Sequence, residues 1–194
     1  MITFFCIIII ALCFIIAYLL TEKDKFYFDG ERLKNFPVRI KGKEYWISRS
    51  CAVVGLVTKE TENGLMFLAN KRGSGCPDYV GYWNVPCGYV DYDESLEEAV
   101  SREVFEETGL NTKPEDWEFL GINSDPKKSN NQTISVRWHT KYDEKMGGFD
   151  TSHSEKDEVD EVKWIDINDI DDYNWAFNQY ELLNTIREIV SKNH

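Results

Sequence analysis

Basic residues are scarce in this chain of 194 residues. Lys and Arg total 22 against 34 Asp and Glu, so the formal net charge is −12. A protein that binds the phosphate backbone of nucleic acid usually carries a basic patch, and no strong one is present here. We therefore expect no bulk nucleic-acid partner. The acidic excess suits a protein that holds Mg²⁺ or Mn²⁺ and meets polyphosphates together with metal.

Cysteine is also sparse, and its spacing forms no recognisable framework. Cys6 and Cys13 lie in an apolar N-terminal run, which leaves Cys51, Cys76 and Cys87. These three form an odd number without a CxxC pair, which argues against a disulfide framework and against a zinc site. This usage is typical of a reducing compartment.

Charged side chains are absent from residues 1–20, MITFFCIIIIALCFIIAYLL. A helix of this length spans about 30 Å, which matches the hydrocarbon core of a bilayer. A signal peptide would begin with basic residues, have a shorter apolar core and end at small residues, and this segment fits none of these marks. We expect residues 1–20 to be a retained single-pass transmembrane anchor. Secretion after signal cleavage is the alternative.

The region after this run is basic at first and then polar. Several Lys and Arg residues lie between Lys23 and Lys34, and the positive-inside rule places the part that follows in the cytoplasm. We interpret residues 21–44 as a tether. Residues 45–194 are long enough for one domain with its own core, and we expect the catalytic domain there, facing the cytoplasm.

The domain mixes strand and helix patterns. Apolar runs at 52–57 and 65–69 flank the turn signal Glu62-Asn63-Gly64 and predict a hairpin. Further strands are expected at 82–86, 117–122, 133–141 and 162–167, and helices at 94–108 and 173–190. Asp93 is the expected N-cap of the first helix and Gly109 its C-terminal glycine. Because regular βαβ alternation is missing, we expect an α+β fold with a mixed-sheet sandwich.

The expected helix 94–108 has carboxylates among its apolar side chains. At about 100° per residue its apolar stripe covers one arc, into which Glu103 and Glu107 also project, with Glu106 just past the edge. Arg102 lies about 100° away on the same wheel, so we expect no basic side chain in that arc. Burying unpaired carboxylates is costly. Acidic side chains at i, i+3 and i+4 converge, and a hard divalent cation with oxygen ligands would compensate their charge.

These residues belong to a longer pattern. Gly88 is followed after five residues by Glu94, and after seven more by the run REVFEETGL from Arg102 to Leu110. This pattern resembles the Nudix box, GX5EX7REUXEEXGU with U aliphatic, at every defined position. The chain is therefore similar to the Nudix hydrolase family, which includes MutT-like proteins. The box covers residues 88–110, and the resemblance extends over roughly 45–192.

The resemblance implies a fold and an activity. Nudix proteins are α/β/α sandwiches that hydrolyse a diphosphate bond in a nucleoside diphosphate derivative, NDP-X, by attack of water on phosphorus with Mg²⁺ or Mn²⁺. A (d)NTP or an ADP-ribose-like nucleotide is the expected substrate. The alternative is a non-catalytic Nudix-fold module that senses a nucleotide. Family members are often dimers, so a homodimer is an expected partner state.

The resemblance also implies roles within the box. Glu103, Glu106 and Glu107 would be metal ligands, and Glu103 is also a candidate general base. Gly88 would present its carbonyl oxygen to the metal. Arg102 would orient a box carboxylate by charge-assisted hydrogen bonds. Two interpretations remain open for Glu94: an ordinary helix N-terminal acid, or an auxiliary metal ligand or orienting group.

Outside the box the assignments rest on weaker signals. Glu158 lies where family members often carry an extra catalytic or metal-binding Glu, although Glu155 and Glu161 compete and the segment also fits a solvated acidic loop. The substrate-binding candidates each have an ordinary surface or core explanation as well. These candidates are Lys71 and Arg72 toward phosphate, Asn178 toward the base, and Trp83 and Tyr82 as stacking surfaces.

Overall fold

The computed structural model describes residues 35–128 and 132–192, which fall into two units divided between Ser48 and Arg49. The described part of the first unit is a hairpin of β1 (Phe36–Ile40) and β2 (Lys43–Ile47). The predicted domain boundary at residue 45 lies inside β2. The predicted anchor at 1–20 lies outside the described residues. In the two described stretches, no helix is long and apolar enough to cross a bilayer.

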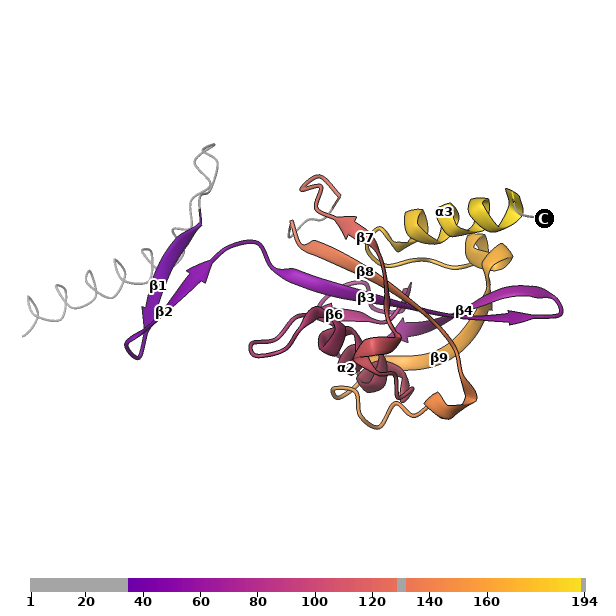
Figure 1. Ribbon diagram of the computed structural model, residues 1–194, viewed down its shortest axis with the longest axis horizontal. Helices are drawn as coiled ribbons and strands as arrows, with labels where there is room; N and C mark the ends of the chain where they lie inside the picture. The colour runs from indigo at the N-terminus through magenta and orange to yellow at the C-terminus, as the bar shows by residue number, and fades with distance from the viewer. Residues whose placement is uncertain (1–34, 129–131, 193–194) are drawn as a thin grey trace, which may run out of the picture. The chain divides into compact units, whose positions relative to one another are not determined.

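The second unit is built on one mixed sheet (Figure 1). Its strands are β3 (Cys51–Thr61), β4 (Gly64–Arg72), β5 (Trp83–Asn84), β6 (Cys87–Tyr89), β7 (Glu118–Asn123), β8 (Ile134–Lys141) and β9 (Val159–Asp166). The main order is β5-β4-β3-β8-β7, with β6 paired to β3 and β9 paired to β4. β3 and β8 run parallel and the other pairs are antiparallel.

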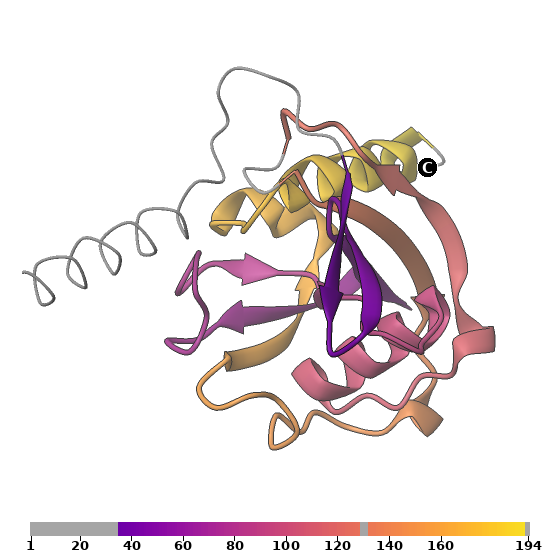
Figure 2. The same cartoon turned by 90° about the vertical axis from the view of Figure 1, so that its left-hand side faces the viewer.

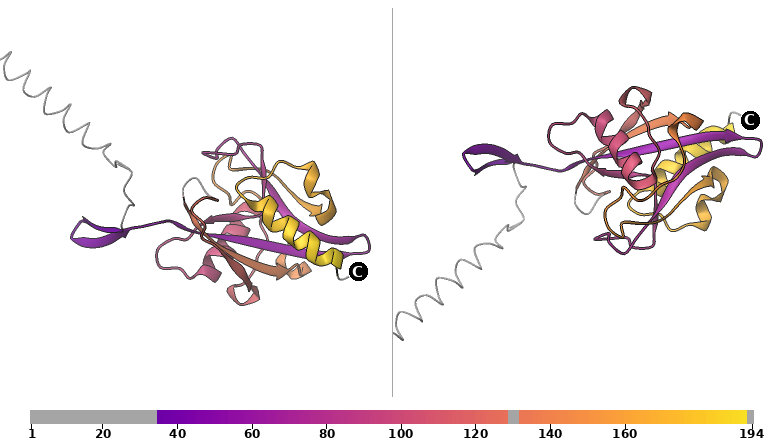
Figure 3. Two further views of the ribbon diagram at one scale, coloured as in Figure 1. Left: turned by 90° about the horizontal axis from the view of Figure 1, so that it is seen from above. Right: turned by 90° about the horizontal axis from the view of Figure 1, so that it is seen from below.

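Two helices cover opposite faces of this sheet. Helix α2 (Leu96–Thr108) lies on one face and α3 (Gln179–Lys192) on the other (Figures 2 and 3). Short 3₁₀ turns, η1 (Pro114–Asp116), η2 (Glu144–Met146) and η3 (Ile167–Asp172), complete the unit. The predicted α/β/α sandwich with a mixed sheet is therefore confirmed for the described part of the chain.

Strand β3 supplies both cores because its side chains alternate between the two faces of the sheet. Val53 and Val57 pack in the cluster that contains α2, whereas Val54 and Leu56 pack in the cluster that contains α3. Gly55 faces α2, and a Cβ there would lie 2.7 Å from a methyl group of Val104. The missing side chain lets the helix approach the sheet closely, which fixes the depth of the box carboxylates.

The second predicted helix is wrong at its N-terminus. It was expected to begin at residue 173, but α3 begins at Gln179. Trp175 instead forms a parallel bridge with Trp83, and the amide of Ala176 donates to the carbonyl of Trp83 at 2.8 Å. Pairing with a distant strand therefore competes successfully with helix formation, and Phe177 turns the chain with φ +55°. The short strand β6 was not predicted.

Candidate active site

Helix α2 is fixed at both ends by its own sequence. Ser95 is the N-cap, and it forms a capping box with Glu98. The prediction of Asp93 as the N-cap is corrected, since Ser95 begins the helix two residues later. Gly109 ends the helix with φ +80°, as expected for a C-terminal glycine. Glu94 therefore precedes the helix and is free to fold back along it.

Arg102 is the centre of an ion-pair network. Its guanidinium binds both carboxylate oxygens of Glu94, at 2.8 and 3.0 Å, and donates to the carbonyl of Tyr89 at 3.0 Å. One Nη atom also bridges Glu103 at 2.8 Å and Glu106 at 3.0 Å. The expectation from the helical wheel, that the acidic arc contains no basic side chain, is thus wrong, whereas the contacts with Glu103 and Glu106 are of the kind that the family resemblance implies for Arg102. The position of a Cα on the helical wheel does not limit so long a side chain, and Arg102 folds onto the acidic face.

The network bears on the two interpretations of Glu94. Its contact with Arg102 is bidentate, and the same carboxylate accepts a 2.7 Å hydrogen bond from the amide of Asp91. The hydrogen bond from Arg102 holds the pKa of Glu94 below its usual value. These contacts favour the interpretation of Glu94 as an orienting group, since Glu94 binds Arg102 and Arg102 in turn contacts Glu103 and Glu106.

Glu107 has a different environment from the other box carboxylates. It is 2% exposed among the apolar residues beneath α2, and it accepts a 3.0 Å hydrogen bond from the amide of Cys87. Burial raises its pKa well above the usual value, and the charges of Glu103 and Glu158 add to this. Burial likewise raises the pKa of Glu103 to about 7, although Arg102 opposes the shift. The wheel prediction that carboxylates point inward is confirmed for Glu107.

The donor set fits a hard divalent cation. Glu103, Glu107 and Glu158 influence one another electrostatically, and their oxygens are the ligand type that Mg²⁺ and Mn²⁺ prefer. Glu107 is a nearly fully buried acid whose charge burial disfavours, which is the environment that a cation would relieve. In the described ranges, however, no three His, Cys, Asp or Glu side chains already converge on one point. Two of the box carboxylates are turned toward Arg102 instead.

Gly88 lies directly against Glu103. It sits in β6, paired with Val53, and a Cβ at Gly88 would lie 2.1 Å from a carboxylate oxygen of Glu103. No other residue type leaves this space for the carboxylate. Strand β6 and helix α2 therefore approach each other closely at Gly88 and Glu103. This is the place where the Gly88 carbonyl and the box carboxylates are expected to bind the metal together.

Glu158 belongs to the same electrostatic cluster, whereas its competitors do not. Its charge raises the pKa values of both Glu103 and Glu107. Glu155 is exposed, and Glu161 pairs with Lys71 in the β4–β9 ladder and is also exposed. Of these three acids, Glu158 is the one that the fold brings to the box helix.

The segment before Glu158 is held by the loop after β4. The amides of Gly73 and Gly75 donate to the carbonyls of Glu158 and Asp157, each at 2.7 Å. The thiol of Cys76 adds a 3.2 Å contact to the Glu158 carbonyl. A Cβ at Gly73 would lie 2.3 Å from the Asp157 carbonyl oxygen, so the two backbones touch. This clamp fixes the backbone at Glu158, whose charge acts on Glu103 and Glu107.

Substitution of Gly73 tests the clamp. Because a backbone carbonyl blocks the new Cβ, Gly73→Ala should displace the segment that carries Glu158. We expect kcat to fall about 10- to 100-fold, the usual cost of disturbing a group that supports a metal or catalytic site. Gly148→Ala, where a Cβ meets nothing within 4 Å, is the matched control. Equal kcat values in the two variants, each checked for folding by thermal melting, would show that the clamp is irrelevant to activity.

The raised pKa of the buried Glu107 carboxyl group predicts that the stability of the metal-free protein depends on pH. A raised pKa in the folded state means that the folded chain binds the proton more tightly than the unfolded chain does. This contribution to stability is complete below about pH 4.5 and is lost as pH rises, by at most about 1.4 kcal/mol for each pH unit. With chelator present, wild type should therefore lose stability relative to Glu107→Gln between pH 5 and 8. Denaturant unfolding at each pH measures this difference, and parallel curves would refute it.

The two basic candidates end β4, with a β-bulge between Lys71 and Arg72. Arg72 is only 8% exposed and forms an ion pair with Asp78 at 2.9 Å. Its charge still lowers the pKa of Glu107, so it lies within electrostatic reach of the box. Lys71 is half-buried, opposite Trp83 and Glu161 in the neighbouring strands.

The structure places Trp83 and Asn178 in different environments. Trp83 is 7% exposed, with Tyr173 at its edge and the Lys163 ammonium 4.3 Å from its ring. The prediction that Trp83 offers a stacking surface is corrected, because its ring lies in the core. Asn178 immediately precedes α3 rather than lying within it, and its buried Nδ2 has no hydrogen-bond partner among the described residues.

Buried amides near the box were missed by sequence reasoning. Asn70 and Asn84 are 1% and 0% exposed, and the Oδ1 atom of each lacks a partner in the described part of the chain. Gln179, at the start of α3, is 3% exposed and bonds the backbone of Val85. The signal was present as amide residues inside apolar segments, but the sequence alone did not show that Asn84 and Gln179 meet at the sulfur of Cys87.

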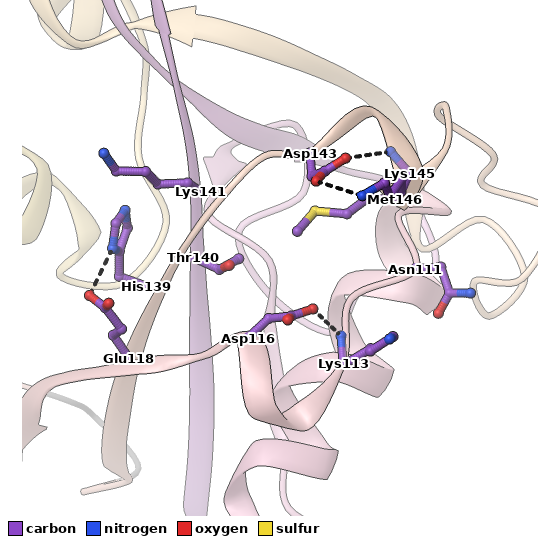
Figure 4. Close-up of a pocket in the computed structure, with 10 residues that line it drawn as sticks. All are labelled: Asn111, Lys113, Asp116, Glu118, His139, Thr140, Lys141, Asp143, Lys145 and Met146. Atoms are coloured by element: carbon purple, nitrogen blue, oxygen red, sulfur yellow. Dashed lines mark hydrogen bonds and ion pairs between the residues drawn. The ribbon is translucent and has the colours of Figure 1, made fainter.

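A cavity lies elsewhere, between η1, η2 and the ends of β7 and β8 (Figure 4). Three lysines and three acids are among its lining residues: Lys113, Lys141, Lys145, Asp116, Glu118 and Asp143. The lining contains none of the predicted site residues. Its charges balance, and Lys145 and Asp143 face each other at 3.8 Å. We therefore place the candidate active site at the box helix, where the buried carboxylates gather.

The fold and this helix define a class of protein: an α/β/α sandwich with a carboxylate-rich helix held against its central strand. The NUDIX domain model matches residues 49–186. The chain belongs to the Nudix family.

Curated relatives agree with this assignment. An RNA pyrophosphohydrolase of Wolbachia sp. subsp. Drosophila simulans is 30% identical over 104 residues, covering 50% of this chain and 60% of the relative. An ADP-ribose pyrophosphatase of Methanocaldococcus jannaschii is 33% identical over 89 residues, covering 46% and 48%. The chain thus matches about half the length of these relatives.

Solved structures share the fold. The NUDIX domain of Shewanella oneidensis NrtR, determined with ADP ribose, aligns with a TM-score of 0.60 and 21% identity over 73% of this chain and 88% of that one. A MutT/nudix family protein from Enterococcus faecalis aligns with a TM-score of 0.61 and 20% identity over 90% and 69%. At these identities the likeness concerns the fold alone.

Proposed function

We propose that this chain hydrolyses the diphosphate bond of a nucleoside diphosphate derivative, either a (d)NTP or an ADP-ribose-like nucleotide, with Mg²⁺ or Mn²⁺. The observation that carries the proposal is the set of box carboxylates with Glu107 buried at 2% exposure and Glu103 beside Gly88. Relatives named RNA pyrophosphohydrolase and ADP-ribose pyrophosphatase support the reaction class.

The site residues fall into two groups: those that would hold the cation and the one that would accept a proton from water. Glu103, Glu106 and Glu107, with the carbonyl of Gly88, would hold the cation. The cation, when bound, neutralises diphosphate charge and lowers the pKa of water. Arg102 and Glu94 keep the carboxylates in place through the hydrogen bonds described above. Arg72 adds positive charge on the side of β4 and would face the phosphates.

Glu158 is our candidate general base. Glu103 is tied to Arg102 by a 2.8 Å hydrogen bond, whereas within residues 35–128 and 132–192 the Glu158 carboxylate accepts one hydrogen bond, of 3.3 Å, from the amide of Glu155. Water would form the new P–O bond as the anhydride P–O bond breaks, and its proton would pass to Glu158. Each product carries one of the two phosphoryl groups that the broken anhydride bond had joined.

A substrate panel tests the proposal. The full chain, purified in mild detergent, is incubated with Mg²⁺ or Mn²⁺ and with (d)NTPs, ADP-ribose, dinucleoside polyphosphates and sugar nucleotides. Ion-exchange chromatography then identifies the products. Cleavage of one nucleotide class at the diphosphate bond is the expected result. Tight binding of one compound without any cleavage would overturn the proposal in favour of a nucleotide-sensing module.

We also propose that residues 1–20 anchor the protein in a membrane with the Nudix domain in the cytoplasm. The support is the uncharged run of 20 residues followed by basic residues. Resistance of the full chain to alkaline extraction from membranes, with an intact N-terminus by sequencing, is the expected result. A mature N-terminus beyond residue 20 would instead indicate a secreted enzyme.

A further inference from the structure

The hairpin of β1 and β2 is a two-stranded sheet of its own (Figure 1). A single pair of strands is marginally stable at best in water, because it buries too little apolar surface. Such a hairpin needs a further layer against one of its faces. The register and the charges of this hairpin indicate the chemistry of that layer.

One face of the hairpin is apolar. Residues directly opposite each other in an antiparallel ladder point to the same side, and successive residues alternate between sides. The register therefore places three cross-strand pairs on one face: Phe36 with Ile47, Val38 with Tyr45, and Ile40 with Lys43. Ile40 and Ile47, at opposite ends of this face, are 56% and 43% exposed. We call these six residues the apolar hairpin face.

The opposite face is more polar. It carries Pro37 opposite Trp46, and Arg39 opposite Glu44. Arg39 and Glu44 form an ion pair at 3.8 Å, which directs both side chains to this side. The two faces therefore differ in chemistry, and Trp46 and Ile47 are neighbours in sequence that lie on different faces.

Basic side chains gather at the tip of the hairpin. The strands are joined by the two-residue turn Lys41-Gly42, in which both residues have positive φ, +49° and +82°. This turn places Lys41 next to Lys43, whose Nζ lies 5.4 Å from the centre of the Tyr45 ring. Glu44 is the one acid between residues 36 and 47, and it is paired with Arg39. The tip is therefore positive, in a chain whose net charge is −12.

An anionic lipid bilayer fits both features. Segments that lie in the membrane interface combine apolar and aromatic side chains, which enter the headgroup region, with Lys and Arg, which attract anionic lipids. Lys43 belongs to the apolar hairpin face, and its long stem lets the ammonium group reach the headgroups while its neighbours enter the apolar layer. A second copy stacked on the same face would instead bury two Lys43 ammonium groups among apolar side chains, which is costly.

The position of the hairpin in the chain favours the same partner. Residues 21–35 join the proposed membrane anchor to β1, and a fully extended stretch of this length spans at most about 55 Å. The anchor would therefore keep the hairpin close to the bilayer surface. Anionic lipids would repel the acidic excess of the rest of the chain, so the attraction is confined to the basic hairpin.

We infer that the apolar hairpin face lies in the headgroup layer of an anionic bilayer, with Lys41 and Lys43 bound to lipid phosphate groups. The hairpin is then a second membrane contact, in addition to the anchor. This inference rests on the proposed anchorage, which brings the hairpin to the membrane, and it is independent of the hydrolase proposal. Each basic residue near an anionic surface contributes about 5-fold to lipid affinity.

Quenching of tryptophan fluorescence by brominated lipid tests which face meets the bilayer. The full chain is reconstituted in vesicles of brominated phosphatidylcholine and phosphatidylserine. The signal of Trp46 is that of wild type minus that of Trp46→Phe, and the signal of position 47 is that of Trp46→Phe/Ile47→Trp minus that of Trp46→Phe. We expect at least about 2-fold more quenching at position 47, because successive residues of a strand point to opposite faces.

A charge substitution tests the contact with anionic lipid. Lys41→Gln/Lys43→Gln should reduce the quenching at position 47 at least about 2-fold, because the attraction to phosphatidylserine is lost. Lys113→Gln/Lys145→Gln is the matched control, since both of these lysines are exposed and lie outside the hairpin. The control should quench as the unsubstituted lysines do. Vesicles without phosphatidylserine should give the lower quenching for all of these proteins, and circular dichroism checks that each variant is folded.

The outcomes separate the hairpin contact from the anchor. Equal quenching at positions 46 and 47, or unchanged quenching in Lys41→Gln/Lys43→Gln, overturns the inference. Protection of position 47 from both brominated lipid and aqueous acrylamide also overturns it, because the face is then covered by protein. A chain that resists alkaline extraction without quenching at position 47 keeps the anchor and loses the hairpin contact. A chain that alkali releases, but that is quenched at position 47 in phosphatidylserine vesicles, keeps the hairpin contact and loses the anchor.

Discussion

Glu106→Gln should lower kcat by about 10³-fold, because loss of a ligand to a catalytic cation removes several kcal/mol of transition-state stabilisation. The substitution keeps the side-chain shape and can still accept from Arg102, so the fold should survive. Glu106 and Glu103 are half-buried whereas Glu107 is buried, and replacing the Glu106 carboxylate by an amide creates no cavity. The effect should therefore appear in catalysis and not in stability.

Steady-state kinetics at saturating Mg²⁺ measure this effect. Glu115→Gln is the matched control, since Glu115 is exposed in η1 and lies outside the box, which ends at Leu110. The control should retain wild-type kcat. A Glu106→Gln enzyme with kcat within a few-fold of wild type would remove Glu106 from the cation site.

Gly88→Ala should produce the second large effect, a fall in kcat of about 100-fold, the scale expected when a catalytic group is misplaced by an ångström. The new methyl group would overlap the carboxylate of Glu103, whose atoms lie 2.1 to 2.3 Å from the Cβ position. Because the blocked group is the end of a flexible side chain, Glu103 would rotate away. The thermal midpoint should therefore change little while activity is lost.

A double substitution separates steric displacement of Glu103 from other effects at Gly88. If Gly88→Ala acts by moving Glu103, adding it to Glu103→Gln should cost little further activity. Gly148→Ala is the control for glycine replacement. Additive losses in the double variant would show that Gly88 acts independently of Glu103.

Local sequence determined the box helix well. The capping residues, the apolar stripe and the terminal glycine all lie within one short segment, so α2 was predicted with an error at its first residues only. The hairpin of β3 and β4 followed from two apolar runs and a clear turn signal at Asn63-Gly64. Features that depend on neighbours within a few residues are accessible to this kind of reasoning.

Contacts between distant segments were not accessible in the same way. Phe177 reads as part of an amphipathic helix, and only pairing of Trp175 with Trp83 shows that it turns outward. The helical wheel alone places Arg102 away from the carboxylates, because it ignores where a long side chain folds, and only the family resemblance indicated its contacts with Glu103 and Glu106. The clamp on Glu158 depends on two loops more than 80 residues apart, as in the Cys76–Glu158 contact.

The central claim is that the box carboxylates bind a divalent cation, and Mn²⁺ titration of the full chain followed by electron paramagnetic resonance tests it most directly. The account predicts that wild type binds Mn²⁺ at least about 10-fold more tightly than Glu106→Gln or Glu107→Gln, since each variant loses a charged oxygen ligand. Glu115→Gln should match wild type. Equal Mn²⁺ affinity in all four proteins would contradict the account.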